Sequence, residues 1–362
     1  MRNKEITQRK TKILATLGPS SNTIKKIIEL SKAGANAFRL NCSHLNEQGL
    51  KDYVKKIRRA EKILNKPIGI LVDLQGPKIR IGKVKDGENI LKKDSIFLLD
   101  LKKEIGNYKR VTLPHKKIFS SAKNGHLILL DDGKIHLKVT SVKANEIRTK
   151  VLQGGLLKSN KGVNLPQTNI RTSALSSIDK KFASIAVQEG VDWIALSFVQ
   201  KPNDIKELRK ICLNKVSIMA KIEKPTALDY INEIADLADG IMIARGDLGV
   251  ELPIESVPGW QKKIIRVARV KGRPVVVSTQ MLESMTSSLT PTRAEVSDVA
   301  NAVFEGADAI MLSAESASGD YPVETVKMMN KIAINIEKDS NYNDILSSQL
   351  EDTPDTTPDA IA

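Results

Sequence analysis

The stretch VSIMAKIEKPTALDYINEIADLADGIMIARGDLG, residues 216–249, decides the fold of this chain. It holds two apolar runs, 216–222 and 240–244, on either side of a segment, 226–237, in which apolar residues recur every three to four positions. Apolar runs without strict alternation are typical of strands buried on both faces of a parallel sheet, and the segment between them has helical spacing. The stretch therefore predicts a strand, a helix and a second, parallel strand.

The same alternation recurs along the whole chain. The eight apolar runs are residues 12–17, 37–40, 68–74, 193–198, 216–222, 240–244, 274–279 and 309–312. Helical spacing between them is clearest in residues 23–33, 50–64, 226–237 and 293–304. Eight strand-helix units predict an α/β fold, a (β/α)8 TIM barrel. An open doubly wound sheet is the alternative, but it would not need eight units with polar clusters at nearly every strand end.

One interval, from about residue 77 to 171, breaks this rhythm. Its short β-rich runs are residues 95–100, 110–113, 126–130, 134–142 and 146–151, and turn residues separate them. A structureless connection of this length would not suit a compact fold, so we expect a small all-β domain inserted after the third strand, a candidate lid. The expected domains are thus residues 1–76 and 172–340 for the barrel, 77–171 for the insert and 341–362 for a linker and the stub of a further domain.

Composition limits the class of protein and its partners. The chain has 362 residues, 41% of them hydrophobic, and no apolar stretch of membrane-spanning length or secretory signal, so we expect a cytoplasmic protein without a membrane partner. Cys42 and Cys212 are too far apart in the sequence to suggest a disulfide framework. The net charge of +15 calls for anionic partners. With 4% aromatic residues and no zinc-finger spacing, small phosphates are favoured over nucleic acid.

Polar clusters at the ends of runs five and six predict a metal and phosphate site. Glu223 and Asp247 would give an incomplete, oxygen-rich shell suited to Mg2+ or Mn2+. Lys221 lies two residues before Glu223, so both side chains point to one face of the strand. A satisfied ion pair is the ordinary interpretation of such a lysine, but beside metal ligands we favour stabilisation of a phosphate or an enolate.

Other strand ends add donors and acceptors. The backbone amides at Gly246 and Asp247 could bind a carboxylate, although a plain turn is the alternative, and Thr279 could donate or relay a proton. Arg39 suits bidentate phosphate binding. His44 is either a general base or an orienting residue.

Hard oxygen donors follow the second and third strands. Asn41, Ser43 and Asp73 together could hold a second cation, while each alone could equally be a satisfied loop residue.

These residues lie in motifs that resemble pyruvate kinases. The motifs are TKILATLGPSS (11–21), AFRLNCSH (37–44), LVDLQGPKIRIG (71–82), KGVNLP (161–166), DWIALSFV (192–199), AKIEKP (220–225), IMIARGDLGVELP (241–253), STQMLESM (278–285) and PTRAEVSDVANAVFEGADAIMLSAES (291–316). The resemblance runs in order from about residue 11 to 335. It implies phosphoryl transfer from phosphoenolpyruvate to ADP, giving pyruvate and ATP in glycolysis, and the family's β domain matches the expected insert.

The resemblance also implies roles for individual residues. Glu223 and Asp247 resemble the divalent-metal ligands, Lys221 the stabiliser of the transferring phosphoryl group and Arg39 the phosphate-binding arginine. Gly246 and Asp247, with Thr279 near the enolate, resemble the substrate pocket. The nucleotide contacts implied are Arg80, Lys161, Asn41 and His44, and those of a monovalent cation are Asn41, Ser43, Asp73 and Leu74.

Two departures from the family pattern affect these expectations. The family usually has a further carboxyl-terminal α/β domain, whereas this sequence stops at Ala362, either as a fragment or as a naturally short form, so a homo-oligomer would lack one interface. Lys78 stands where many members carry Glu, as in a subgroup in which the ammonium replaces a monovalent cation. We therefore expect no requirement for K+. The alternative for Lys78 is a solvent-facing lysine.

Three functions from different classes remain in comparison. The first is an active pyruvate kinase core. The second is a phosphoenolpyruvate or oxalate-type ligand binder with aldolase-like chemistry, which would not need KGVNLP or the insert. The third is a cationic nucleic-acid-binding or interaction protein that has lost catalysis, which would tolerate loss of Lys221, Glu223 and Asp247, and all three residues are present. The enzyme is the hypothesis that uses every motif.

Overall fold

The computed structural model describes residues 9–168 and 173–348. They form two compact units. Of the described residues, we call 9–76, 174–246 and 258–348 the barrel unit, and 77–168, 173 and 247–257 the insert unit. No helix within the described ranges combines the length and the apolar content that a membrane span requires.

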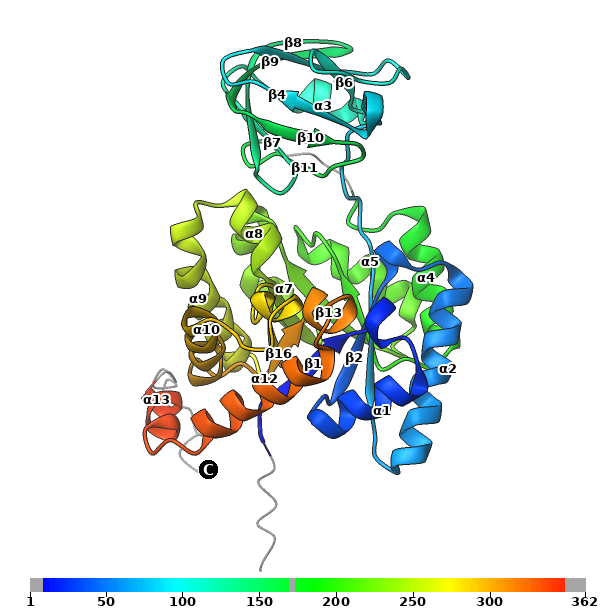
Figure 1. Cartoon of the computed structure of the whole chain (residues 1–362), viewed down its shortest axis with the longest axis vertical. Helices are drawn as coiled ribbons and strands as arrows, with labels where there is room; N and C mark the ends of the chain where they lie inside the picture. Colours follow the sequence, from blue (N-terminus) through cyan, green and yellow to red (C-terminus); the bar gives the residue numbers. More distant parts are fainter. Residues whose placement is uncertain (1–8, 169–172, 349–362) are drawn as a thin grey trace, which may run out of the picture. The chain divides into compact units, whose positions relative to one another are not determined.

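Eight parallel strands close the barrel unit, in the order β1-β16-β15-β14-β13-β12-β3-β2 (Figure 1). They are β1 (Lys12–Thr16), β2 (Ala37–Asn41), β3 (Gly69–Asp73), β12 (Trp193–Leu196), β13 (Ser217–Ile222), β14 (Gly240–Ala244), β15 (Val275–Ser278) and β16 (Ala309–Leu312). Each of the eight apolar runs of the sequence is one of these strands. The predicted α/β barrel is confirmed.

The strands are apolar because both of their faces are buried. All five residues of β14 are buried, and the interior of the barrel holds the buried cluster Leu14, Leu71, Ala195, Met219, Met242, Val276 and Met311. The register then sets which strand ends meet. Asp73 pairs with Ala195, and Leu196 pairs with Ala220, so the ends of β3, β12 and β13 lie at one level.

Helices alternate with the strands and lie around the barrel (Figure 1). The main ones are α1 (Ile24–Ala33), α2 (Glu47–Leu64), α4 (Ser177–Gln188), α5 (Pro202–Cys212), α7 (Ile231–Leu237), α9 (Val257–Val270), α10 (Arg293–Phe304) and α12 (Pro322–Glu337). Residues 226–237 do not form the single helix suggested by their apolar spacing. They are divided into α6 (Pro225–Leu228) and α7 by Tyr230, whose backbone is not helical.

The insert unit has a six-stranded sheet, β11-β7-β8-β9-β5-β6, and a two-stranded sheet, β10-β4. Its strands are β4 (Glu88–Leu91), β5 (Ile96–Asp100), β6 (Arg110–Thr112), β7 (Leu127–Leu130), β8 (Ile135–Lys143), β9 (Glu146–Gln153), β10 (Gly155–Lys158) and β11 (Val163–Asn164). Five of them match the β-rich runs of the sequence. A short helix, α3 (Lys116–Ser121), also occurs in an interval without a helical pattern, because Ile118 and Phe119 are buried in the core of the unit.

The carboxyl-terminal part of the described chain is more ordered than the sequence suggested. Residues 342–348, expected within a linker, form helix α13 (Tyr342–Ser348). Tyr342 is buried, and its ring lies 6.4 Å from that of Phe304. Residues 349–362, the rest of the expected linker and stub, lie outside the described residues.

Candidate active site at the carboxyl ends of the strands

A buried lysine lies between two buried carboxylates at the ends of β3 and β13. Lys221 Nζ is 2.9 Å from Glu223 Oε1 and 3.1 Å from Asp73 Oδ1. It also donates a hydrogen bond of 2.7 Å to Ser197 Oγ. Burial by itself lowers the pKa of Lys221, but the charges of Asp73 and Glu223 outweigh it and raise the pKa above its ordinary value. The ammonium is therefore charged at neutral pH.

Arg39 extends this group of charges from β2. Its Nε donates to Asp73 Oδ2 over 2.7 Å, and its Nη1 donates to Thr16 Oγ1 over 3.2 Å. Burial raises the pKa of Asp73, but the charges of Lys221 and Arg39 outweigh that effect, and the pKa lies below its ordinary value. Arg39, which is partly buried, and the buried Asp73, Lys221 and Glu223 thus form a row of alternating charges, which we call the charge row.

Glu223 is fixed by the loop that follows β12. The backbone N–H of Phe198 donates to Glu223 Oε2 over 2.7 Å. Phe198 has φ of +56°, a left-handed conformation that a bulky side chain rarely adopts. Such backbone strain is common at functional sites, where surrounding contacts hold it in place.

The space beside this loop requires a glycine. A Cβ on Gly76 would lie 2.6 Å from Phe198 Cδ2, and Gly76 itself has a positive φ of +69°. The N–H of Gly76 donates to the buried Asp179.

A second left-handed loop lies at the end of β15. Thr279 has φ of +73°, and its hydroxyl accepts a hydrogen bond of 2.8 Å from the N–H of Gly246, the residue expected to bind a substrate carboxylate. Arg245 holds this loop by donating to the carbonyls of Ser278 and Thr279, and its Nη1 lies 2.6 Å from Asp298 Oδ1. Gly246 and Thr279 are therefore brought together, as the sequence suggested.

Asp247, the second expected metal ligand, lies in α8 (Arg245–Glu251), the helix that directly follows β14. Asp247 belongs to the insert unit, and its Oδ1 lies 3.9 Å from Nζ of Lys78 in the same unit. Glu223 belongs to the barrel unit, so the pair of Glu223 and Asp247 stays a prediction. Among the described residues there is no group of three or more His, Cys, Asp and Glu side chains that could hold a metal. A divalent ion here would need substrate and water oxygens to complete its shell.

Three of the four residues expected around a monovalent cation, Asn41, Asp73 and Leu74, have oxygens that already have partners. Both carboxylate oxygens of Asp73 face cationic side chains. Asn41 Oδ1 accepts from the N–H of Ser43, and the carbonyl of Leu74 accepts from Ser197. His44 is exposed at the end of a short 3-10 turn, η2 (Cys42–His44).

Two of the four expected nucleotide contacts, Arg80 and Lys161, lie close together in the insert unit. Arg80 forms a β-bridge with Gly162, next to Lys161, and its Nη1 donates to the carbonyl of Asn160. Lys161 Nζ lies 2.7 Å from Asp131 Oδ1. Arg80 and Lys161 therefore extend from the two sides of one β-bridge. An anion that binds there would replace the carbonyl of Asn160 and the carboxylate of Asp131 as their partners.

Three residues of the site were missed in the sequence: Thr16, Ser197 and Phe198. Thr16 and Ser197 end or directly follow strands, which is the one sequence signal that could have found them. The role of Phe198 depends on loop conformation, for which the sequence has no pattern.

Comparison with known proteins identifies the family. A family model described as the pyruvate kinase barrel domain matches residues 8–326. A pyruvate kinase of Methylorubrum extorquens is 51% identical over 98% of this chain and 74% of its own length. One from Agrobacterium vitis is 46% identical over 98% of this chain and 75% of its own length.

A solved structure agrees with these sequences. The crystal structure of a pyruvate kinase from Cryptosporidium parvum superposes with a TM-score of 0.92 at 33% identity, covering all of this chain and 76% of that one. A barrel-domain model that matches residues 8–326, relatives that cover 98% of the chain and a solved structure with the same fold lead to one conclusion. The chain belongs to the pyruvate kinase family.

Proposed function

We propose that this chain catalyses phosphoryl transfer from phosphoenolpyruvate to ADP at the carboxyl ends of its barrel strands, giving pyruvate and ATP. The charge row is the observation that carries the proposal, because it places two cations and two carboxylates at the ends of β2, β3 and β13. The bond between phosphorus and the enol oxygen breaks, and a bond from phosphorus to an oxygen of the β-phosphate of ADP forms. The enolate left behind takes up a proton at carbon and becomes pyruvate.

Lys221 and Arg39 are the cations for the moving charge. Lys221 is buried, charged and fixed by Asp73, Glu223 and Ser197, so it needs little reorganisation as negative charge shifts from the phosphoryl group to the enolate. Arg39 binds the substrate phosphate through the guanidinium edge not used by Asp73. We place Thr279 beside the enolate, with the amides of Gly246 and Asp247 for the substrate carboxylate.

A divalent ion suits the donor chemistry of the site. Glu223 and Asp247 would hold Mg2+ or Mn2+ by carboxylate oxygens, the ligand type these ions prefer. When bound, the ion supplies Lewis-acid stabilisation of the phosphoryl and enolate oxygens. Arg80 and Lys161, with Asn41 and His44, would contact the phosphates of the nucleotide.

We further propose that Lys78 takes the place of K+, so that no monovalent cation is required. Two observations support this role. Asp73, the carboxylate of the Asn41, Ser43, Asp73 and Leu74 set, already neutralises two cations. Lys78 has an ammonium 3.9 Å from the Asp247 carboxylate.

We also propose that the domains are bounded as residues 1–76, 77–171, 172–340 and 341–362.

A coupled assay for pyruvate tests the function. The full chain with phosphoenolpyruvate, ADP and Mg2+ should form pyruvate and ATP in equal amounts, and chelation of the metal should stop both. A chain that binds phosphoenolpyruvate but forms no pyruvate would instead be the ligand binder of the second hypothesis.

A further inference from the structure

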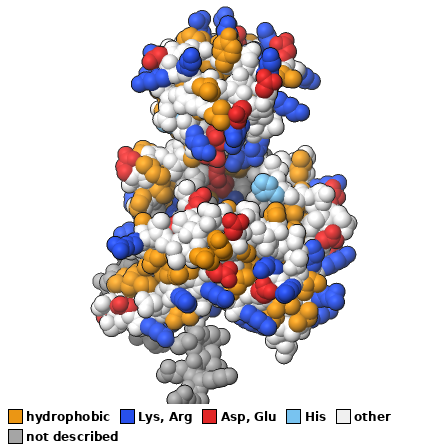
Figure 2. Space-filling view, viewed as in Figure 1, with side chains coloured by type: hydrophobic (Ala, Val, Ile, Leu, Met, Phe, Trp, Pro, Cys, Tyr) orange, Lys and Arg blue, Asp and Glu red, His pale blue; other side chains and the backbone are white. Residues whose placement is uncertain are grey.

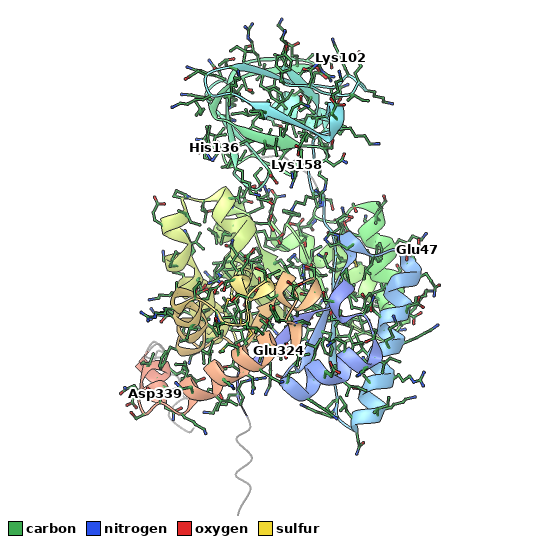
Figure 3. The ribbon with its side chains drawn as sticks, in the orientation of Figure 1. Glu47, Lys102, His136, Lys158, Glu324 and Asp339 are labelled. Carbon is green, nitrogen blue, oxygen red and sulfur yellow. The ribbon has the colours of Figure 1, made fainter. Side chains whose placement is uncertain are left out.

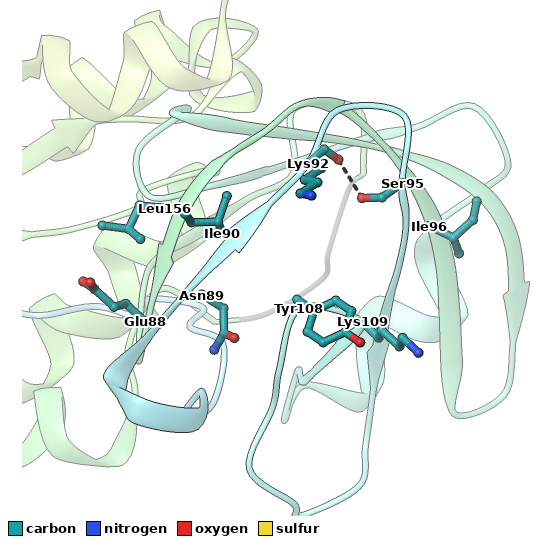
Figure 4. Close-up of a pocket in the computed structure, with 9 residues that line it drawn as sticks. All are labelled: Glu88, Asn89, Ile90, Lys92, Ser95, Ile96, Tyr108, Lys109 and Leu156. Carbon is teal, nitrogen blue, oxygen red and sulfur yellow. Dashed lines mark hydrogen bonds between the residues drawn. The ribbon is translucent and has the colours of Figure 1, made fainter.

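The insert unit contains a groove that the proposed reaction does not use. It has a volume of about 720 Å³ and lies between β4 on one side and the segments around Ile96 and Tyr108 on the other (Figure 4). None of the expected nucleotide or metal residues lines it. Ligand sites for small molecules commonly have volumes of about 300–1,000 Å³, so the groove is large enough for one.

The walls of the groove are apolar although they face solvent. Ile90 and Leu156 are cross-strand partners in the β10-β4 sheet, and Ile90 is 66% exposed. Tyr108 is 58% exposed, and Ile96 lies on the same groove. Six large apolar side chains are exposed among the described residues of 77–168, and these four of them line the groove. Their gathering in one place distinguishes the groove from scattered surface apolar residues.

Cations border the same walls. Lys92 and Lys109 line the groove, and Lys109 Nζ lies 5.4 Å from the centre of the Tyr108 ring. The one carboxylate in the lining, Glu88, has Lys158 as a partner at 3.9 Å.

The groove also lies in the most cationic part of the chain. Residues 77–173 contain 21 Lys and Arg against 8 Asp and Glu, so they carry +13 of the total +15. Lys and Arg are prominent on the visible face of the insert, and Lys102 and Lys158 are among its labelled side chains (Figures 2 and 3).

We propose that this groove binds an amphipathic organic anion, a small molecule with a flat apolar or aromatic body and an acidic group. The body would lie against Ile90, Leu156, Ile96 and Tyr108, and the acidic group would lie between Lys92 and Lys109. Apolar surface removed from water supplies affinity, while the two ammonium groups select for negative charge. A metal cation is disfavoured by the lysines, and inorganic phosphate would leave the apolar walls in water.

Anilinonaphthalene sulfonate is a suitable probe, since it combines an aromatic body with one acidic group, and phenylnaphthylamine is its uncharged counterpart. A fluorescence titration of the full chain should show one saturable site for the sulfonate, which excess Mg2+ and ADP do not displace. Reversal of a contacting charge in Lys109→Glu should weaken binding by about tenfold or more, equivalent to about 1.4 kcal/mol. Ile90→Ser should weaken it as well.

Two exposed residues of the insert outside the groove provide matched controls. Lys143→Glu and Leu152→Ser change the same charge and the same kind of apolar surface, and both should bind the sulfonate as the unchanged chain does. Absence of a saturable site would overturn the proposal, as would displacement by ADP or equal weakening in the control variants. Binding of phenylnaphthylamine as tight as that of the sulfonate would overturn the role of the lysines.

Discussion

Asp73 joins two cations, since one of its oxygens faces Arg39 and the other faces Lys221. A carboxylate whose pKa is lowered in the folded state contributes stability above its unfolded pKa of about 3.9, and this contribution is lost as the pH falls through the lower folded pKa. The unchanged chain should therefore lose this part of its stability only in acid, and keep it throughout the neutral range.

The variant Asp73→Asn tests whether the Asp73 carboxylate stabilises the fold at neutral pH and loses that effect in acid. Removing one partner of a buried ion pair costs about 3–5 kcal/mol, so the free energy of unfolding should fall by that order at pH 7. Urea unfolding should show the difference from the unchanged chain shrinking as the pH drops below about 4, because the carboxyl of the unfolded chain is then protonated while the native carboxylate, with its lower pKa, is still charged. A difference that stays constant from neutral to acid pH would mean that the charge of Asp73 is not what stabilises the fold.

A second prediction at the scale of single residues concerns Lys78. If its ammonium replaces K+, the unchanged chain should be active in tetramethylammonium salts, and Lys78→Glu should become dependent on added K+ because the tethered cation is lost. Lys83→Glu, at an exposed position of the same insert, is the matched control and should remain independent of K+. Strong activation of the unchanged chain by K+ would refute the role of Lys78.

Residues of the site could be predicted from the sequence where a charged side chain lies at or near the end of a strand. Arg39, Asp73 and Lys221 are at or near strand ends, and the structure brings them together with Glu223. Their pairing was not predictable, because it depends on the register between β3, β12 and β13 across a closed barrel.

At the scale of elements, the loop that follows β15 is held in place by Arg245, the first residue of helix α8, which follows β14. Arg245 donates to two carbonyls of that loop and pairs with Asp298. Arg245→Lys keeps the charge but loses the fork of donors, so Thr279 should be held less firmly in its left-handed conformation. We expect kcat to fall by about tenfold, since loss of positioning commonly costs this much or more.

Arg273→Lys is the control for that variant. Arg273 also donates to two carbonyls, those of Ala235 and Asp236, but it lies just before β15, at the opposite end of the strand from Thr279. Steady-state kinetics should show an unchanged kcat for Arg273→Lys. Equal losses in the two variants would indicate a general effect on the barrel and would remove the positioning role from Arg245.

The strands of the barrel were predictable because burial on both faces leaves a continuous apolar run. Three strands of the insert, β4, β10 and β11, were missed because β4 and β10 each bury a single residue and β11 has only two residues, so none of them forms a continuous buried run. The division of residues 226–237 was missed for a different reason. Apolar spacing shows which side of a segment is buried. This spacing continues through Tyr230 although the backbone there is not helical, so it does not reveal where α6 ends and α7 begins.

At the scale of the whole molecule, charge is distributed unevenly. The insert sequence carries +13, which leaves +2 for the rest of the chain. Phosphoenolpyruvate and ADP are both anions, so a field of this sign should speed their encounter with the protein. Screening shortens the reach of that field from about 30 Å at 0.01 M salt to about 8 Å at 0.15 M. We expect kcat/KM to fall over this range, while kcat changes little. An unchanged kcat/KM in tetramethylammonium chloride would exclude electrostatic steering.

The central claim is that the charge row performs the phosphoryl transfer, and Lys221→Met tests it most directly. The change preserves the length of the side chain and deletes the ammonium that lies between Asp73 and Glu223. Circular dichroism should first establish that the variant is folded at the assay temperature. With saturating phosphoenolpyruvate, ADP and Mg2+, kcat should then fall by about 100-fold or more, with a much smaller change in KM. A folded variant with normal kcat, or with a change confined to KM, would contradict the account.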